Sequence, residues 1–241
     1  MQPIHAPVKT GSRAFVLYNG WTLLKQYILT PALDLIFPPA CVGCGRVDTL
    51  LCAPCTQNIA PPDAPATVVS PLHDVQAIGH FSGVLQKAVH ALKYEHLTAL
   101  ARPLGELMAE RIAAMHWPPS LIIPVPLHTD RLQYRGYNQA ALLGQVIAEQ
   151  LHWPWQDNVL MRVRATRSQV GLNYHERQGN VRGAFALAAA DSVRGQDIVL
   201  VDDVYTTGAT MRECAAVLLE DGGAHSVRAI VAGQAGIAGQ R

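Results

Sequence analysis

The sequence predicts an α/β domain with a mostly parallel central sheet flanked by helices, preceded by a small cysteine-rich module. From residue 75 onward, short apolar runs alternate with segments whose apolar residues recur at three- and four-residue spacing, which is typical of alternating strands and helices. The run Ile198-Val-Leu-Val lies between turn signals, as expected for a central strand buried on both faces. The N-terminal part differs, because four of the five cysteines lie within residues 41–55.

The composition indicates a globular chain with enough apolar material for a full core. Of the 241 residues, 49% are hydrophobic and 15% are charged, and the formal net charge is +1. This balance excludes wholesale disorder, which requires low hydrophobicity and high net charge. A near-neutral chain also gives no general argument for a polyanionic partner, so nucleic-acid binding would require a local basic patch.

The first forty residues show neither a membrane span nor an export signal. Residues 21–40 are interrupted by Lys25, Gln26 and Asp34 and by three prolines, whereas a spanning helix needs about 20 mostly apolar residues. We expect a disordered tail over residues 1–14 and an amphipathic helix over residues 15–40 that packs on its own domain. Because no signal for export is visible, the expected location is the cytoplasm.

The four clustered cysteines form two Cys-x2-Cys pairs, Cys41 with Cys44 and Cys52 with Cys55. Two such pairs can close a shell of four thiolates around Zn²⁺, with sulfur atoms at about 2.3 Å. Two disulfides would require an oxidising compartment, and a redox pair normally occurs singly. We therefore expect a structural metal, most simply zinc, in a module over residues 41–60, with the identity of the metal left open. A closed shell leaves no position for a substrate.

The remaining elements follow in order along the chain. A linker rich in proline and alanine is expected over 61–74, and the α/β domain over 75–241. Apolar spacing predicts strands over 75–81, 121–127, 159–163, 184–188, 198–201 and 227–232. It predicts helices over 84–93, 97–115, 139–151 and 211–219. Cys214 falls on the apolar face of the last helix, so we interpret it as a core residue rather than a nucleophile.

Residues 198–210 carry the candidate site. The apolar strand leads into Asp202 and Asp203, and then into a loop of small hydroxylated residues around Gly208 that opens a helix. In open α/β sheets, ligands bind at the carboxyl ends of the strands, and a helix N-terminus is a ready phosphate site. Two carboxylates would repel a bare phosphate, so they suit a ligand that also offers sugar hydroxyls or a divalent cation. An ordinary strand–turn–helix with a capping threonine does not explain the two aspartates.

This segment resembles the ribose-phosphate motif of type I phosphoribosyltransferases, which has four apolar residues, two acids and then Thr-Thr-Gly-x-Thr. The resemblance extends over about residues 33–233 to the ComF/ComFC/GntX-like family, which also carries an N-terminal four-cysteine module. The motifs that carry it are Pro124-Val-Pro-Leu127, Arg131-Leu-x-x-Arg-Gly-Tyr-Asn-Gln139, Thr166-x-x-Gln169-x-x-Leu172 and Arg177-x-x-Asn-Val-x-x-Ala-Phe185.

The resemblance implies a type I phosphoribosyltransferase-like fold that binds phosphoribosyl pyrophosphate together with Mg²⁺. Asp202 and Asp203 would be the catalytic residues facing the ribose 2′- and 3′-hydroxyls. The residues expected to bind the rest of this ligand are Tyr205, Thr206, Thr207, Gly208, Ala209 and Thr210 at the 5′-phosphate, and Pro126, Leu127, Arg135, Gly136 and Arg177 at the pyrophosphate or in a lid over 164–182. The acceptor is not indicated by any motif. His90, Lys93 and Tyr94 resemble a family motif, but solvent exposure explains them equally well.

A non-catalytic single-stranded DNA-binding protein on the same scaffold is the alternative. The family takes its name from bacterial competence, so single-stranded DNA and other competence proteins are further expected partners. Residues 131–182 hold seven arginines against three acidic residues, a local excess of four positive charges. Single-strand binders combine such charge with aromatic stacking platforms. The aromatic residues interleaved here are Tyr134, Tyr137, Trp153, Trp155 and Tyr174.

Overall fold

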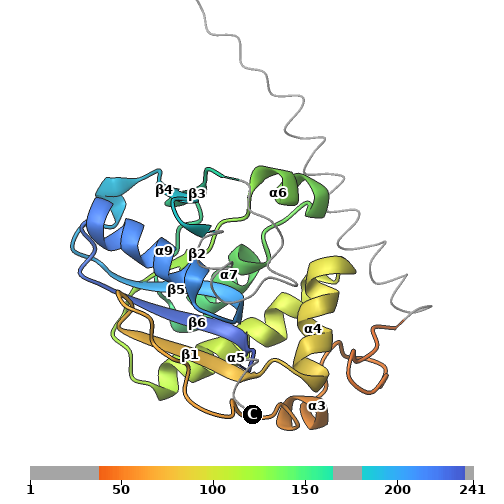
Figure 1. The fold of residues 1–241 in the computed structure, drawn as a ribbon. Coiled ribbons are helices and arrows are strands. Elements are labelled where there is room, and N and C mark those ends of the chain that lie inside the picture. Colours follow the sequence, from red (N-terminus) through yellow and green to blue (C-terminus); the bar gives the residue numbers. More distant parts are fainter. Residues whose placement is uncertain (1–37, 165–180, 237–241) are drawn as a thin grey trace, which may run out of the picture.

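The computed structural model describes residues 38–164 and 181–236, and its centre is a four-stranded sheet (Figure 1). The strands are β1 (Asp74–His80), β2 (Leu121–Pro124), β5 (Asp197–Tyr205) and β6 (Ser226–Gln234), in the order β1-β6-β5-β2. Every neighbouring pair in this sheet is parallel. The predicted α/β class with a parallel central sheet is therefore confirmed.

Helices and a small second sheet surround the central sheet. The longer helices are α4 (Gly83–Tyr94), α5 (Ala101–Ala114), α7 (Gln139–Leu151) and α9 (Ala209–Ala216). The shorter elements are α3 (Ala53–Gln57), α6 (Thr129–Arg135), 3₁₀ turns at Thr98–Leu100 and Ala190–Ser192, and a π turn at Val217–Asp221. Strands β3 (Leu160–Arg162) and β4 (Phe185–Leu187) form the antiparallel second sheet.

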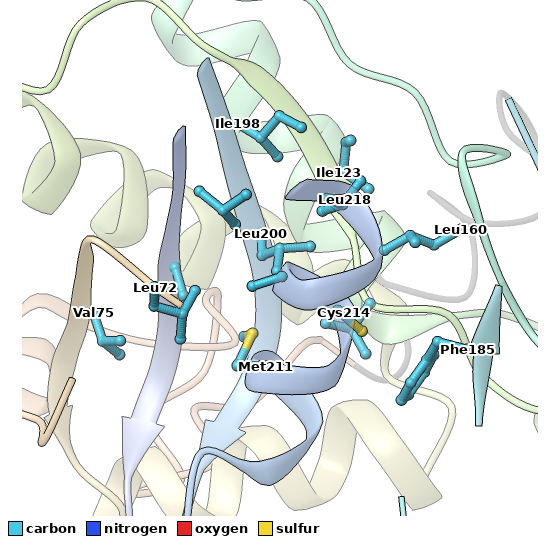
Figure 2. Close-up of a cluster of buried hydrophobic side chains, with 14 of the residues drawn as sticks. Leu72, Val75, Ile123, Leu160, Phe185, Ile198, Leu200, Met211, Cys214 and Leu218 are labelled. Carbon is cyan, nitrogen blue, oxygen red and sulfur yellow. The ribbon is translucent and has the colours of Figure 1, made fainter. Parts of the chain in front are cut away.

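Each face of the central sheet has its own hydrophobic cluster, because side chains alternate between the two faces along a strand. In β5, Ile198 and Leu200 belong to one cluster, whereas Val199 and Val201 belong to the other. The first cluster packs against α9 and the small sheet, and the predicted core position of Cys214 is confirmed there (Figure 2). The second cluster packs against α4, α5 and α7.

Helix α7 has the bounds that the sequence predicts, because a side chain fixes its start. Asn138 caps the helix by accepting a hydrogen bond from the backbone N–H of Ala140 at 3.0 Å. Its amide also donates to the carbonyl of Val125 at 3.0 Å, which ties the helix to the loop after β2. A Cβ on Gly105 would lie 2.7 Å from Cγ1 of Val146, so glycine allows α5 and α7 to pack this closely.

The cysteine-rich segment packs against the second cluster beside α4. Val42 and Ile59 contribute partly buried side chains to that cluster. A Cβ on Gly43 would lie 2.6 Å from Sγ of Cys55 and 2.7 Å from Cγ2 of Val84, which is in the first turn of α4. The cysteine segment therefore lies directly against the start of the helix whose far end reaches the carboxyl edge of the sheet.

Two predicted helices differ from the structure at their ends. Of the helix expected over 15–40, residues up to 37 lie outside the described residues, and residues 38–40 are not helical. Pro38 and Pro39 are irregular there, since proline lacks the backbone donor that a helix needs, and Ala40 forms a bridge with Val47. The helix expected over 97–115 begins as a 3₁₀ turn and becomes α-helical only at Ala101.

Near the site, several elements are longer or shorter in the structure than the sequence predicts, and one was not predicted. The strand predicted over 198–201 continues to Tyr205, whereas the strand predicted over 121–127 ends at Pro124, where the prolines begin. The helix expected over 211–219 is α-helical only to Ala216. Helix α6 was not predicted. Its signals were present in the sequence, because His128 accepts from the backbone N–H of Asp130 at its start, and glycine ends it.

Candidate functional site

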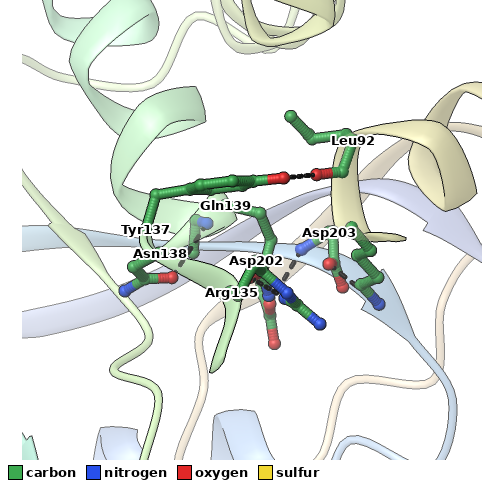
Figure 3. A network of polar contacts seen from close by, with 9 residues as sticks. Leu92, Arg135, Tyr137, Asn138, Gln139, Asp202 and Asp203 are labelled. Atoms are coloured by element: carbon green, nitrogen blue, oxygen red, sulfur yellow. Dashed lines mark hydrogen bonds and ion pairs between the residues drawn. The ribbon is translucent and has the colours of Figure 1, made fainter. Parts of the chain in front are cut away.

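Two adjacent aspartates near the carboxyl end of β5 form the centre of the site (Figure 3). Asp202 and Asp203 lie inside the strand, three and two residues before its end at Tyr205. The backbone N–H of Asp203 donates to Oδ1 of Asp202 at 2.9 Å. Asp203 is buried, with 3% of its surface exposed. A charged carboxylate at this depth requires a partner, because removing it from water is costly.

Lys93 supplies that partner from across the site. Its Nζ atom, on α4, lies 2.8 Å from Oδ2 of Asp203, and the two side chains are 20% and 5% exposed. The sequence alone left Lys93 open between solvent exposure and contact with a ligand. In the structure it is mostly shielded from solvent and faces the two acids.

The surroundings shift the pKa values of both Asp202 and Lys93. Burial, followed by the negative charge of Asp203, raises the pKa of Asp202 to about 7. For Lys93, burial would lower the pKa, but the charge and hydrogen bond of Asp203, together with the charge of Asp202, outweigh burial and raise it. At neutral pH the Asp202 carboxyl group is therefore close to its titration midpoint, beside the ion pair of Lys93 and Asp203.

The loop after β5 turns sharply into α9 at Gly208, whose φ of 73° lies in the left-handed region. A Cβ at this position would collide with the hydroxyl group of Tyr205. That hydroxyl donates to the carbonyl of Thr67 at 2.7 Å, so the loop is held between the strand and the linker. Because the N-cap residue is a glycine, no capping side chain from it occupies the first N–H groups of α9. Such a helix start favours an anion.

A cavity of about 400 Å³ opens at this edge of the sheet. It brings together six of the predicted site residues, which are Pro126, Leu127, Asp202, Asp203, Thr206 and Thr210. The two acids, the hydroxyls of the loop and the turn after β2 therefore face one space. The spacing of the motifs along the sequence could not show this, because β2 and β5 are about 75 residues apart and meet only as paired strands.

Two predicted pyrophosphate contacts lie outside the lining of this cavity. Arg135 donates a hydrogen bond to Oε1 of Gln139, and its guanidinium carbon lies 5.4 Å from the ring centroid of Tyr94. Gly136 ends α6 with a φ of 80°, so its role in the fold is the left-handed turn before α7. Arg135 itself does not line the cavity, but both of its partners, Tyr94 and Gln139, do.

The other predicted phosphate-loop residues shape the loop. Tyr205 and Ala209 are buried in the first hydrophobic cluster. Thr207 and Gly208 are part of the turn but do not line the cavity, and the Thr207 hydroxyl accepts from Ala209 N–H at 3.5 Å. Arg177 lies outside the described residues, as does most of the segment expected as a lid over 164–182.

The face of α4 is the part of the site that sequence reasoning did not assign. Four cavity-lining residues recur there at three- and four-residue spacing, which places them on one side of the helix. They are Gln86, Val89, His90 and Lys93, with Tyr94 beside them and Phe81 just before the helix. That spacing was visible in the sequence, but it equally fits a solvated helix face, and only the opposing strand shows what it faces.

Two arginines add positive charge to the lining of the cavity. Arg131 of α6 and Arg162 of β3 both line it. Burial, followed by the positive charge of Arg131, lowers the pKa of Arg162, and Asp202 acts in the opposite direction. The guanidinium carbon of Arg162 also lies 5.2 Å from the ring centroid of Phe185. The described cavity therefore carries two carboxylates on one strand and three cationic side chains around them.

The four clustered cysteines converge as the sequence predicts. The Sγ atoms of Cys41, Cys44, Cys52 and Cys55 all lie within 4.8 Å of one another. Four sulfur atoms at about 2.3 Å from a tetrahedral metal would be about 3.8 Å apart, so the cluster fits such an ion. All five cysteines of the chain are free. The Sγ atoms of Cys44 and Cys52 lie 3.6 Å apart, much farther than a bonded pair.

The protonation of this cluster also favours a cation. Burial raises the pKa of Cys41, but backbone N–H groups of Cys52, Cys44 and Gly43 outweigh burial and lower it to about 6. Desolvation and the neighbouring thiols, together with the charge of Cys41, raise the pKa of Cys55 to about 12. The thiolate of Cys41 therefore forms readily, whereas ionisation of Cys55 is strongly disfavoured. A bound divalent cation removes that opposition, because it stabilises all four thiolates.

The comparisons with known proteins agree with these features. A phosphoribosyl transferase domain model matches residues 138–237. The DNA utilization protein YhgH of Salmonella typhimurium is 36% identical over 194 residues, covering 76% of this chain and 84% of that protein. Competence protein F of Haemophilus influenzae is 36% identical over 148 residues, covering 58% of this chain and 64% of that protein. The chain belongs to the ComF-like family.

Two further similarities are more limited. Competence protein ComFC of Bacillus subtilis is 33% identical over 114 residues, covering 44% of this chain and 41% of that protein. The adenine phosphoribosyltransferase of Leishmania donovani is 16% identical, covering 61% of this chain and 68% of that one, with a TM-score of 0.36. The phosphoribosyltransferase-like fold follows from the domain match and the parallel sheet.

The domain model matches only part of the residues that form the site of this ComF-like chain. Residues 138–237 include the acidic pair and the loop that opens α9. The opposing wall, which is formed by α4, lies before the matched region. Within the described ranges, no helix is both long enough and apolar enough to cross a bilayer.

Proposed function

We propose that this ComF-like protein binds phosphoribosyl pyrophosphate in the cavity at the carboxyl edge of the sheet and transfers its phosphoribosyl group. The observation that carries the proposal is the placement of two carboxylates and a phosphate-type loop on the same cavity. Asp202 and Asp203 would accept hydrogen bonds from the ribose hydroxyls, and Thr206 and Thr210 would donate to the 5′-phosphate. Pro126 lies in the turn that would face the pyrophosphate.

The proposed reaction breaks the bond between ribose C1 and the pyrophosphate oxygen while C1 bonds to the acceptor, and pyrophosphate leaves. The residues of the chain would orient the ribose, exclude water and stabilise the charge that develops on the leaving group. Arg131 and Arg162 line the cavity and carry the positive charge that this role requires. The acceptor would enter beside α4.

Magnesium would assist by neutralising the pyrophosphate, and it usually keeps several waters and binds through substrate phosphates. The described part of the chain fits that arrangement, since its only group of three or more closely spaced metal-ligating side chains is the cysteine cluster. We expect titration calorimetry with phosphoribosyl pyrophosphate to show one site per chain that requires Mg²⁺. Absence of binding with Mg²⁺ present would refute the proposal, and an acceptor screen would follow binding.

The phosphate loop offers a test that separates ligand binding from stability. Gly208→Ala should weaken phosphoribosyl pyrophosphate binding, because the new methyl group displaces the Tyr205 hydroxyl that anchors the loop. Gly195→Ala is the matched control, since Gly195 also has a left-handed φ of 70° but would meet nothing within 4 Å. Both variants should lose about 1–2 kcal/mol of stability from the backbone alone. Only the Gly208 variant should also lose affinity; equal affinities would contradict this role of the loop.

We further propose that the cysteine cluster holds one structural Zn²⁺. The fit of the four sulfur atoms to a tetrahedral ion supports this, as does the lowered pKa of Cys41. A four-thiolate shell has no open coordination position, so the metal would stabilise the fold and take no part in the transfer reaction. Reduced thiols of this kind fit a protein that works in the cytoplasm.

Single-stranded DNA binding is the second candidate function, and helix α6 is the observation that favours it. Tyr134 is 88% exposed on that helix, between Arg131 and Arg135. An exposed aromatic ring flanked by cationic side chains is the combination that single-strand binders use for stacking and phosphate contact. Two of the relatives are named competence proteins and one is named a DNA utilization protein. Other competence proteins would then be partners.

Salt dependence tests this second candidate. If α6 binds single-stranded DNA, affinity should fall with salt at a slope of about −0.7 per phosphate neutralised. Tyr134→Ala should weaken DNA binding through lost stacking, about 1–3 kcal/mol per base, while leaving phosphoribosyl pyrophosphate affinity unchanged. Arg131→Ala should weaken both ligands, since Arg131 also lines the cavity. DNA binding that is insensitive to salt and to both substitutions would place the DNA elsewhere.

A further inference from the structure

We propose that residues 60–69 form a strap that positions the phosphate loop (residues 205–210), and that metal bound at the cysteine cluster raises the affinity for phosphoribosyl pyrophosphate through this strap. The inference rests on the proposed ligand and on the proposed structural metal. The sequence alone indicates only a linker over 61–74. The strap residues act through the loop and take no part in the transfer reaction.

The strap crosses the carboxyl ends of neighbouring strands in turn. At β1, the backbone N–H of His80 donates to the carbonyl of Ala60 at 2.8 Å. At β6, the side-chain amide of Gln234 donates to the carbonyl of Ala64 at 3.2 Å. These two strands are neighbours in the sheet, and β5 is next to β6. The strap therefore lies across the edge of the sheet that carries the candidate site.

The strap reaches the phosphate loop at the end of β5. The hydroxyl group of Tyr205 donates to the carbonyl of Thr67 at 2.7 Å. Val69 lies against the turn that follows, because a Cβ on Gly208 would be 3.1 Å from Cγ2 of Val69. Ala66 is buried in the first hydrophobic cluster, which holds this part of the strap against the domain. The shape of the loop thus depends on where the strap lies.

The other end of the strap is attached to the cysteine cluster. Helix α3 begins directly after Cys52, contains Cys55 and has no buried residue. A helix of this length without buried contacts is not stable by itself in water, so the metal would hold it. Ile59 follows the helix and packs on β1, where a Cβ on Gly79 would collide with Cγ2 of Ile59. Loss of the metal should therefore loosen the residues that lead into the strap.

Three prolines make the strap stiff enough to transmit this change. Pro61, Pro62 and Pro65 lie between the contact of Ala60 with β1 and the contact of Thr67 with the loop. Proline-rich segments are extended and semi-rigid, because the ring of proline fixes φ. Loosening at the cysteine end should therefore change the position of Thr67, whereas a flexible strap would absorb it.

The strap is the element with two states, docked or loosened. Metal favours the docked state because it orders α3, and the ligand favours it because its 5′-phosphate requires the loop in the docked shape. Coupling of this kind is reciprocal. If metal raises the affinity for phosphoribosyl pyrophosphate by some factor, that ligand raises the affinity for metal by the same factor.

The test compares four proteins by calorimetric titration with phosphoribosyl pyrophosphate in the presence of Mg²⁺. They are the wild type, the cysteine variant Cys44→Ser with Cys55→Ser, the strap variant Pro61→Gly with Pro62→Gly and Pro65→Gly, and the combination of both variants. Substitution removes the cysteine-bound metal without a chelator that would compete for Mg²⁺. We expect the cysteine variant to bind about 5- to 150-fold more weakly than the wild type.

The strap variant should also bind more weakly, although it keeps about one zinc per chain, because its loop is no longer held. In this background the cysteine substitutions should cause no further loss, since two changes that act through one connection are not additive. Pro118→Gly with Pro119→Gly is the matched control, because these exposed prolines lie before β2, at the amino ends of the strands. In the control background the cysteine substitutions should have their full effect.

A second measurement follows the coupling in the other direction. A zinc-selective chelator is titrated into the wild type with and without saturating phosphoribosyl pyrophosphate and Mg²⁺. The ligand should raise the chelator concentration that removes half of the zinc from the wild type and from the proline control. It should have no such effect on the strap variant. A contact that only stabilises the fold would not produce this dependence on the strap.

The outcomes separate this inference from the proposals on which it rests. If the wild type does not bind phosphoribosyl pyrophosphate, or holds no metal, the inference fails together with that proposal. If both bind and the cysteine variant has wild-type affinity, only the coupling is overturned. If the cysteine substitutions weaken binding equally in the wild type and the strap variant, the effect travels by another route, such as the contact of Gly43 with Val84 at the start of α4, and the strap is overturned. Non-additive losses together with protection of the zinc by the ligand support the proposal.

Discussion

The substitutions Asp202→Asn and Asp203→Asn are expected to change the stability of the protein in opposite directions. Both are expected to weaken binding of the same ligand. Asp202→Asn should stabilise the protein above pH 7. The folded pKa of Asp202, about 7, is above its ordinary value of 3.8, so the folded protein binds that proton more tightly than the unfolded chain. The stability from this proton is complete below about pH 4 and is lost as pH rises toward 7. Removing the carboxyl group should restore about 1–3 kcal/mol at pH 8.

Asp203→Asn should instead destabilise the protein, because it leaves the Lys93 ammonium without its counter-ion in a mostly buried position. Breaking one side of a buried pair costs about 3–5 kcal/mol, and the 20% exposure of Lys93 places the expected loss at the lower end. Both variants should weaken phosphoribosyl pyrophosphate binding by about 1.5–3 kcal/mol for each lost charged acceptor.

Thermal melts at pH 5 and pH 8, together with calorimetric titrations, distinguish the two variants. Asp197→Asn is a useful control, because Asp197 begins the same strand far from the cavity and pairs with Arg228 at 3.7 Å. It should leave ligand affinity unchanged. Equal stability changes in Asp202→Asn and Asp203→Asn would contradict the asymmetry of the pair, and unchanged affinity in both would show that the motif does not bind a ribose.

Disruption of the cysteine cluster is expected to have the largest structural effect. The double variant Cys44→Ser with Cys55→Ser should lose its metal and unfold residues 41–60, because structural zinc contributes about 10–16 kcal/mol of binding free energy in small zinc domains. The loosening should continue into the first turn of α4, where Val84 touches the cysteine segment. Strands β5 and β6 should keep their protection from hydrogen exchange.

Metal analysis and hydrogen exchange test this result together. Wild-type protein purified under reducing conditions without chelators should contain about one zinc per chain, and the double variant none. Cys214→Ala is the control, since Cys214 is buried far from the cluster in the other hydrophobic core and should keep the metal. Metal-free wild-type protein, or unchanged exchange over 41–60 in the double variant, would contradict a structural zinc site.

The sequence was most informative where one interaction dominates the local structure. The bounds of α7 were predicted correctly, since a capping Asn138 starts the helix and its apolar stripe continues to Leu151. The parallel sheet was equally readable, because Ile198 to Val201 are apolar on both faces of the strand. The cysteine cluster was predicted from spacing alone, since the short loop within each Cys-x2-Cys pair holds its two thiols close together.

The rest of the site depended on contacts between distant segments. The pairing of Lys93 with Asp203 joins residues 110 positions apart, and nothing local in either segment specifies it. The role of Arg135 at the pyrophosphate stays a prediction from its motif, and the motif did not indicate that its guanidinium carbon lies 5.4 Å from the ring centroid of Tyr94. A motif identifies the residue type that a family retains, whereas the direction of a long side chain is decided by what packs around it.

The strand order has a consequence for how this protein is made on the ribosome. Each parallel pair of the central sheet includes β5 or β6, which are the last strands of the described chain. No ladder of this sheet can form until residues 197–205 have left the exit tunnel. During most of synthesis β1 would have no strand partner and β2 would have only its bridge to Trp155, and such incompletely paired strands are prone to association. The cysteine knuckles need only twenty residues and a metal ion, so they can be the first part of the nascent chain to fold.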